Sequence, residues 1–269
     1  MSQCFTFSPF TKQCFVTLGV ILNTMEQAVI NGFSSVLVPQ LRESKYIELD
    51  EEAESWIASI QSLSLLIGAL IVPSIMGIYG RKVANCLSAA ILCLSWFGMT
   101  VCTDFYSLLF IKLIQGLCAG MIAIFASVTV GEYTSPKYRG AFLATISCSY
   151  SIGMLLVHGL GTVLSWQNVA RVFGAITFLD CVIILYSPET PSFLVAKGRF
   201  DECRKVFHWL RYKDEEAEVE KLIKKTKDRT LQEIEEKFRG KQVTEKVTEP
   251  SDMCSTPLNL DVEHNRNEK

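Results

Sequence analysis

Several polar side chains stand inside stretches of the sequence that are otherwise apolar. Within residues 14–38, Asn23, Gln27 and Asn31 recur at every fourth position, so a helix would place them along one side, with Glu26 adjacent. An ionisable group in such a stretch is costly if the stretch crosses a membrane, and it usually faces a cavity or a partner. The stripe fits either a hydrophilic pathway or hydrogen bonds between helices, worth about 1 kcal/mol or less each. We favour the pathway, because a carboxylate suits helix contacts poorly.

Other residues in the apolar stretches have more than one interpretation. His158 either lines a cavity or bonds a neighbouring backbone carbonyl, and the sequence favours neither. We include His158 among the candidate pathway residues. Lys112 is expected to extend its ammonium group along the helix to the membrane interface. Gly116 and Gly120 stand four residues apart and are expected to let another helix approach closely.

The cysteines and histidines do not indicate a metal site, a cofactor or a disulfide framework. None of the 10 cysteines forms a CxxC pair, and most lie in apolar runs, where Cys behaves as a small hydrophobe. The 3 histidines are too far apart to complete a metal site. The motifs HExxH, GxSxG and GxxxxGK[ST] do not occur, so no enzyme is expected. A net charge of −2 excludes a generally basic, nucleic-acid-binding surface.

Six apolar segments position these residues, and each has about the 20 residues that a membrane-spanning helix needs. They are residues 14–38, 55–76, 83–102, 106–130, 140–164 and 169–186. Residues 77–82 and 103–105 are such short connections that the helices they join must be antiparallel neighbours. The sequence therefore predicts an all-α fold, a polytopic transmembrane bundle of six spans whose first span is retained rather than cleaved.

The charges in the short loops predict the orientation of the bundle. One side carries Lys12, Arg81, Lys82, Lys137, Arg139, Lys197 and Arg199, and the other carries Arg42, Lys45 and Arg171 beside an acidic run. The side richer in Lys and Arg is expected to be cytoplasmic. An even number of spans then places both termini in the cytoplasm.

The chain is expected to divide into four parts. A cytoplasmic amino terminus (1–13) precedes the transmembrane domain (14–186), a cytoplasmic helical segment (187–240) follows, and a disordered polar tail (241–269) ends the chain. In the helical segment, Cys203, Phe207 and Leu210 recur at helical spacing between charged residues. This pattern predicts short amphipathic helices on the cytoplasmic side of the membrane.

Three clusters on the expected cytoplasmic side combine helix-breaking residues with charges. They are Gly77–Lys82 (GIYGRK), Gly131–Gly140 (GEYTSPKYRG) and Ser187–Leu194 (SPETPSFL). The candidate gating residues in them are Gly80, Arg81, Lys82, Glu132, Arg139, Gly140, Pro188 and Glu189. Charge-assisted bonds between these bases and carboxylates could latch helices together in one conformation and break in another. The positive-inside rule accounts for the bases but not for the carboxylates.

In their order and spacing, these clusters resemble the GRR/GRK loop, the E-x6-RG motif and the PETP motif of the sugar porters in the major facilitator superfamily. The style is closest to the insect facilitated trehalose transporter-like group. The resemblance covers about residues 14–240, and it implies the first six-helix half of such a carrier in the plasma membrane. Ser147 stands where many sugar porters have a substrate-binding Gln, so it joins the expected pathway. Gly77, Lys112 and Ser192 replace an acidic residue, an Arg and an Arg of the family pattern.

The leading functional interpretation is a sugar-porter-type carrier that facilitates the movement of trehalose or a hexose across a lipid bilayer. The alternative is a transport-inactive half-carrier that binds or regulates a full-length relative. The expected partners are therefore the sugar, the bilayer, and a second copy of the chain or a full-length carrier. Sugar flux separates the two interpretations.

Overall fold

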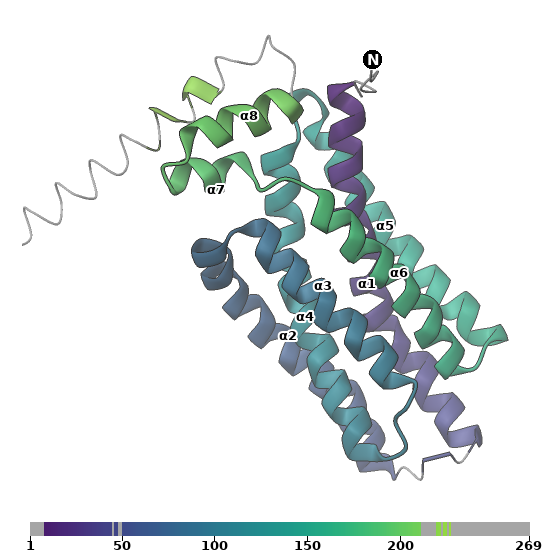
Figure 1. Ribbon diagram of the computed structural model, residues 1–269. Helices are drawn as coiled ribbons and strands as arrows, with labels where there is room; N and C mark the ends of the chain where they lie inside the picture. The colour runs from purple at the N-terminus through teal and green to yellow at the C-terminus, as the bar shows by residue number, and fades with distance from the viewer. Residues whose placement is uncertain are drawn as a thin grey trace, which may run out of the picture. The chain divides into compact units, whose positions relative to one another are not determined.

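The computed structural model describes residues 8–44, 46–47, 50–210, 219–221, 223–224 and 226. Its contacts divide the chain into two units, Met1–Ile223 and Lys224–Lys269, and the helices below all belong to the first. They are α1 (Pro9–Ser44), α2 (Glu51–Tyr79), α3 (Arg81–Met99), α4 (Phe105–Tyr133), α5 (Pro136–Val163), α6 (Trp166–Tyr186), α7 (Pro191–Ala196) and α8 (Phe200–Leu210) (Figure 1).

The helices α1 to α6 are each long and apolar enough to cross a membrane. This finding confirms the six predicted spans and the all-α fold. Most helices extend past the predicted bounds, since polar residues at a helix end continue the backbone hydrogen bonds without being apolar themselves. The first helix, for example, runs over 36 residues rather than over residues 14–38 alone.

The starts of two helices are fixed by side-chain caps. The Asp50 carboxylate accepts a hydrogen bond of 2.8 Å from the backbone N–H of Ala53 at the start of α2. Asp104 does the same for α4, accepting from the N–H of Ser107 at 2.9 Å. This backbone hydrogen bond, more than any other contact, lowers the pKa of the Asp104 carboxyl. The last residue of each of these two connections therefore also caps the helix that follows it.

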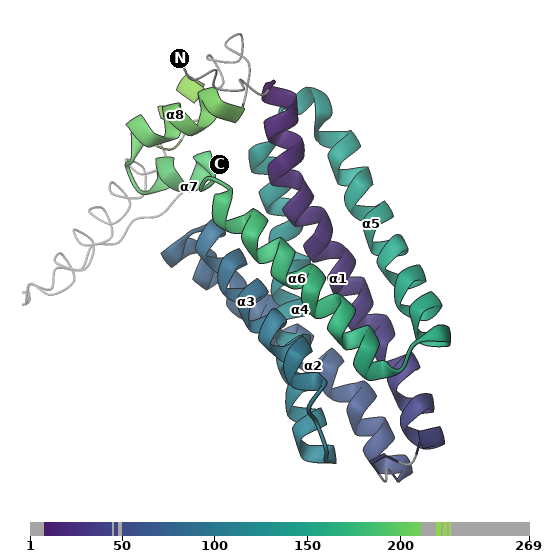
Figure 2. The ribbon, with the colours of Figure 1, turned by 45° about the vertical axis from the view of Figure 1, so that its right-hand side comes forward.

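The six long helices pack most extensively as the pairs α2–α4, α1–α5 and α3–α6. Figures 1 and 2 show α5 running beside α1. Both α2 and α5 contact the bundle through one narrow stripe each, so most of their remaining surface is exposed. The helices α1 and α4, by contrast, are buried on several sides. Because α2 and α5 are covered on one side only, a surface with polar side chains remains on α1, α2 and α5.

An aromatic cluster joins three of the spans at the centre of the core. Phe33 of α1 and Trp96 of α3 meet edge to face, with 5.3 Å between their ring centroids. The Trp96 ring also lies 5.9 Å from that of Phe173 on α6. All three side chains are fully buried. Such contacts position α1 against the α3–α6 pair.

Two glutamines hold the ends of α1 to its neighbours. The Gln40 amide donates to the carbonyl of Gly161 at 2.8 Å and accepts from the backbone N–H of Trp166 at 2.6 Å, which fixes the α5–α6 turn. At the other end, Gln13 donates to the carbonyl of Leu210 at 2.9 Å. Here α8 buries Cys203, Phe207 and Leu210. The predicted amphipathic helix over these residues is confirmed, whereas the predicted tail (241–269) lies outside the described residues.

Candidate functional site

A continuous network of polar side chains links α1, α2, α4 and α5. The Lys112 ammonium of α4 donates to the Ser34 hydroxyl at 3.0 Å and to the Gln61 side-chain oxygen at 3.2 Å. The Gln61 amide nitrogen donates in turn to the Asn31 side-chain oxygen at 3.0 Å. The Asn31 amide nitrogen donates to the Tyr150 hydroxyl of α5 at 3.1 Å. Four helices therefore contribute donors and acceptors to one chain of hydrogen bonds.

The prediction that Lys112 reaches the membrane interface was wrong. Its side chain is fully buried, and its ammonium also lies over the Phe33 ring, 4.9 Å from the ring centroid. Because Lys112, Gly116 and Gly120 are spaced by four residues, they share one side of α4, and both glycines pack on α2. Oxygen atoms in the interior of the bundle accept the hydrogen bonds of the ammonium group, so the Lys112 side chain does not extend to the membrane interface.

This network adjoins a cleft between α1 and α2, at the end of the bundle away from α8. The cleft has a volume of about 590 Å³ and is lined by Ser34, Ser35, Val38, Pro39, Arg42, Glu51, Glu54, Ser55 and Ala58. Arg42 pairs with Glu54 there, with 3.0 Å between the guanidinium Nε and a carboxylate oxygen. Ser34 belongs to both the cleft and the network. The cleft and the network together form a site rich in hydroxyl and amide groups.

The polar stripe predicted on α1 is divided between two environments. Asn23 and Glu26 are fully buried, and the Glu26 carboxylate contacts the Thr177 hydroxyl of α6 at 2.7 Å. Gln27 and Asn31 are only half-buried, and Asn31 turns toward α2 and α5. Each step of four residues advances about 40° around a helix of 3.6 residues per turn, so a stripe of three such positions drifts toward a new neighbour. The pathway role assigned to these residues stays a prediction.

The two pathway candidates on α5 lie apart from the buried network. Ser147 and His158 are both exposed. The carbonyl of Ser147 accepts a hydrogen bond of 3.3 Å from the hydroxyl of Ser151, one turn further along. Tyr150, on the same helix, is the side chain that enters the network. The structure therefore brings Asn31 into the site and leaves Ser147 on the open surface of α5. The exposed His158 lies at the α1 side of α5, since a Cβ on Gly32 would be 3.6 Å from its Nε2.

The charged clusters meet at the α8 end of the bundle, where α2–α3, α4–α5 and α6–α7 are connected. The Arg81 guanidinium lies 2.9 Å from a Glu132 carboxylate oxygen, and the two side chains are 20% and 15% exposed. Glu189 accepts backbone hydrogen bonds from Arg81 at 3.0 Å and from Lys82 at 3.1 Å, at the start of α3. A carboxylate at a helix amino terminus is stabilised by the free N–H groups there. The expected ion pair of Arg81 with Glu132 is thus present, whereas Glu189 binds the backbone of residues 81–82 rather than a basic side chain.

Position 80 requires glycine because the Glu189 side chain lies so close to it. Its φ of +101° is in a region that side chains disfavour, and a Cβ there would overlap the Glu189 carboxylate. The carbonyl of Pro188, the neighbouring residue, accepts a hydrogen bond of 2.5 Å from the Tyr133 hydroxyl. The α6–α7 connection is therefore held to both α3 and α4.

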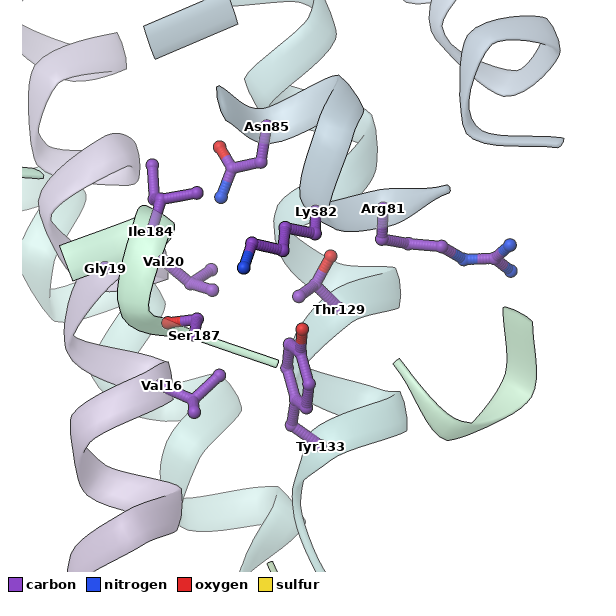
Figure 3. Close-up of a pocket in the computed structure, with 10 residues that line it drawn as sticks. All are labelled: Val16, Gly19, Val20, Arg81, Lys82, Asn85, Thr129, Tyr133, Ile184 and Ser187. Carbon is purple, nitrogen blue, oxygen red and sulfur yellow. The ribbon is translucent and has the colours of Figure 1, made fainter. Parts of the chain in front are cut away.

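For Arg139 the expected contact with a carboxylate was wrong. Its guanidinium donates to the carbonyl of Thr134 at 3.5 Å, because Arg139 lies in the first turns of α5 and turns back toward the connection from α4. Gly140 beside it is exposed, with open space around its Cα. Lys82 extends its ammonium to the carbonyl of Leu185 at 2.8 Å. Figure 3 shows Lys82 reaching across a small pocket while Arg81 points away from it.

Reversing the charge of Glu132 tests the ion pair with Arg81. Glu132→Lys places two cations together in a half-buried site, so we expect it to lower the free energy of unfolding by roughly 1–3 kcal/mol. Adding Arg81→Glu should recover at least half of this loss. Thermal denaturation of the purified protein in detergent measures both effects. Glu202→Lys is the control, since the Arg199–Glu202 pair is about half exposed and should matter little. Additive losses in the double variant would contradict a direct pairing.

Several residues of the site were not singled out in the sequence. Gln61 and Tyr150 belong to the network, while Thr177 of α6 contacts Glu26 and Asp180 of α6 lies beside Gly19 of α1. The signal for Asp180 was present, because the rule that an ionisable group inside a span faces a cavity or a partner applies to it as it does to Glu26. Gln61 carries the same signal more weakly. Tyr150 and Thr177 carry none, since such residues are common in spans.

A family model described as "Sugar (and other) transporter" matches residues 12–253. Among curated proteins, the facilitated trehalose transporter Tret1 of Bombyx mori is 26% identical over 252 residues, covering 92% of this chain and 48% of that protein. Tret1 of Apis mellifera ligustica is 26% identical over 206 residues, covering 76% of this chain and 41% of that protein. The chain spans about half the length of the curated relatives that it matches.

Solved structures share the fold at low sequence identity. The proton:xylose symporter XylE bound to 6-bromo-6-deoxy-D-glucose aligns with a TM-score of 0.66 at 15% identity, covering 82% of this chain and 53% of that chain. A partially occluded inward open XylE from E. coli aligns with a TM-score of 0.64 at 16% identity, covering 82% and 58%. Because the family model matches residues 12–253, most of its length, the chain belongs to the "Sugar (and other) transporter" family.

Proposed function

We propose that the chain forms one side of a membrane carrier for trehalose or a hexose, with the hydrogen-bond network at its centre. The observation that carries this proposal is the continuity of the network from Lys112 to Tyr150, beside a cleft whose lining includes the hydroxyls of three serines. Sugars present closely spaced hydroxyls that both donate and accept hydrogen bonds. Amide, hydroxyl and ammonium groups are the protein groups that exchange bonds with them.

Membrane orientation follows from the charges at the two ends of the bundle. The α8 end carries Lys12, Arg81, Lys82, Lys137, Arg139, Lys197 and Arg199, whereas the cleft end carries Arg42 and Arg171 among the described residues. The positive-inside rule supports a cytoplasmic α8 end, and we propose the plasma membrane as the location. The cleft then opens to the outside, and the ion pair of Arg81 with Glu132 lies at the cytoplasmic end as a latch.

Removing the central amide of the network tests the proposal. Gln61→Leu leaves Lys112 and Asn31 without their shared partner, so we expect kcat/KM for sugar uptake by expressing cells to fall about tenfold. Uptake of radiolabelled trehalose and glucose is measured at equal surface expression. Ser62→Ala is the matched control, because Ser62 is the next residue on α2 and is exposed. Equal uptake by the two variants, or no saturable uptake by the unchanged chain, would contradict the proposal.

A further inference from the structure

A seam of oxygen atoms lies between α1 and α6. On α1, Gly19, Asn23 and Glu26 follow one another at helical spacing, and a Cβ on Gly19 would lie 3.4 Å from a carboxylate oxygen of Asp180. Three residues further along α1, beyond Asn23, Glu26 meets Thr177. Since Gly19 faces Asp180 and Glu26 faces Thr177, Asn23 lies between these two contacts and faces the same part of α6.

Four oxygen atoms of this seam have no hydrogen-bond partner. They are the side-chain oxygen of Asn23, one carboxylate oxygen of Glu26 and both carboxylate oxygens of Asp180. The three residues are fully buried. The Asn23 amide nitrogen is already used, because it donates to the carbonyl of Gly19 at 2.9 Å, so Asn23 offers only its oxygen to the seam. Every unused polar atom here is therefore an acceptor.

No basic side chain neutralises these carboxylates. Of the ion pairs among the described residues, none includes Glu26 or Asp180. Other titratable groups near the seam include the thiols of Cys93 and Cys181. Arg81 and Lys82 line the adjoining pocket that Gly19 also lines. Lys112 uses its ammonium in the separate network with Ser34 and Gln61. Two buried carboxyl groups thus lie on the same α1–α6 contact without a basic partner, where an unpaired charge is very costly.

The hydroxyl of Thr177 limits which of these unpartnered oxygen atoms can be satisfied by protonation. Its oxygen lies 2.7 Å from Glu26 and 2.8 Å from the carbonyl of Phe173, but it has one proton to donate. If that proton goes to Phe173, as is usual for Thr within a helix, Glu26 must itself be protonated and donate to Thr177. One proton on Glu26 accounts for this contact and leaves Asp180 and the Asn23 oxygen unsatisfied.

We propose that Asn23, Glu26 and Asp180 bind one sodium ion in the seam between α1 and α6. Sodium accepts oxygen ligands, and with one proton on Glu26 its charge makes the pair of carboxyl groups neutral. With Glu26 protonated and Asp180 ionised, a single positive charge makes the site neutral, whereas a divalent calcium or magnesium ion would leave one charge in excess. The described residues also contain no cluster of three or more His, Cys, Asp or Glu side chains that could hold a metal. The ligands are therefore two carboxyl groups and a neutral amide oxygen.

A small pocket lies next to the seam, on the side of Gly19. It is lined by Val16, Gly19, Val20, Arg81, Lys82, Asn85, Thr129, Tyr133, Ile184 and Ser187 (Figure 3). Gly19 lines this pocket and also lies against Asp180. The pocket volume of about 20 Å³ is room for one water-sized particle. Asn85 and Thr129 each have an unpartnered buried oxygen among the residues that line it, and Lys82 extends its ammonium across it.

The thermal stability of the purified chain in different salts tests the site. Replacing choline chloride by sodium chloride at constant ionic strength and pH should raise Tm by about 5 °C with saturation, since a ligand of the folded state stabilises it. Asp180→Asn and Glu26→Gln should each abolish this rise. Asp104→Asn is the matched control, because Asp104 caps α4 outside the seam, and it should keep the rise. If Tm depends on pH alone, protons suffice and the proposal is overturned.

Direct binding keeps the proposal testable if the seam variants do not fold. The unchanged protein should bind radioactive sodium saturably, with about one ion per chain, and an excess of unlabelled sodium should displace it. Non-saturable binding, or equal displacement by potassium and choline, would overturn the site. Neither measurement uses sugar, so a negative result here is separate from failure of sugar uptake.

Discussion

Gly120→Ala is expected to lower the free energy of unfolding by about 3 kcal/mol, although alanine is the better helix former. A Cβ at position 120 would overlap the carbonyl oxygen of Leu65 and lie 2.8 Å from the backbone nitrogen of Ala69. Both atoms belong to the backbone of α2, which no rotamer change can move. The variant must therefore separate α4 from α2, the most extensively packed pair in the bundle.

Gly131→Ala is the matched control for this loss. Gly131 lies on the same helix, and a Cβ there would meet nothing within 4 Å. Its replacement should leave the stability unchanged or raise it slightly, because alanine restricts the unfolded chain. Denaturation of the two purified variants in detergent gives the comparison. Equal stabilities would show that α2 and α4 tolerate the added methyl group and that the close approach does not matter.

The bundle itself was predictable because membrane-spanning helices leave a strong pattern in the sequence. Long apolar runs separated by short charged connections gave all six spans, and the spacing of Gly116 and Gly120 indicated a close helix contact. The structure adds the identity of the partner helix. Distance along the sequence does not identify the partner helix, since α2 and α4 pack together although α3 lies between them in the sequence.

The candidate site was less predictable, because it depends on which side of each helix is covered. Lys112 was expected at the membrane interface. It lies four positions before Gly116, however, so the two residues share the side of α4 that faces the interior of the bundle. For Arg139, a nearby backbone carbonyl was a closer acceptor than either carboxylate. The polar stripe on α1 faces α6 at Asn23, but at Asn31 it faces α2 and α5. Periodicity therefore located polar positions but did not assign their partners.

The exposed surface of α5 carries polar side chains that a lipid environment would not solvate. Ser147, Ser151 and His158 are exposed there, and Ser62 is exposed on α2. A polar side chain against hydrocarbon is costly, so we expect protein to cover this surface. Carriers of the major facilitator type hold substrate between two six-helix bodies that rock about a shared site, and a single bundle provides one of them.

Monodisperse monomers of this 269-residue chain, reconstituted into liposomes, are therefore expected to move no trehalose or glucose. Cross-linked dimers of the chain, or complexes with a twelve-span relative isolated from expressing cells, should show saturable uptake that an excess of unlabelled sugar abolishes. Failure of the dimers together with uptake by the mixed complex would favour the regulatory half-carrier. Saturable uptake by the monomers would contradict the expectation, because it would mean that one six-helix bundle completes the pathway by itself.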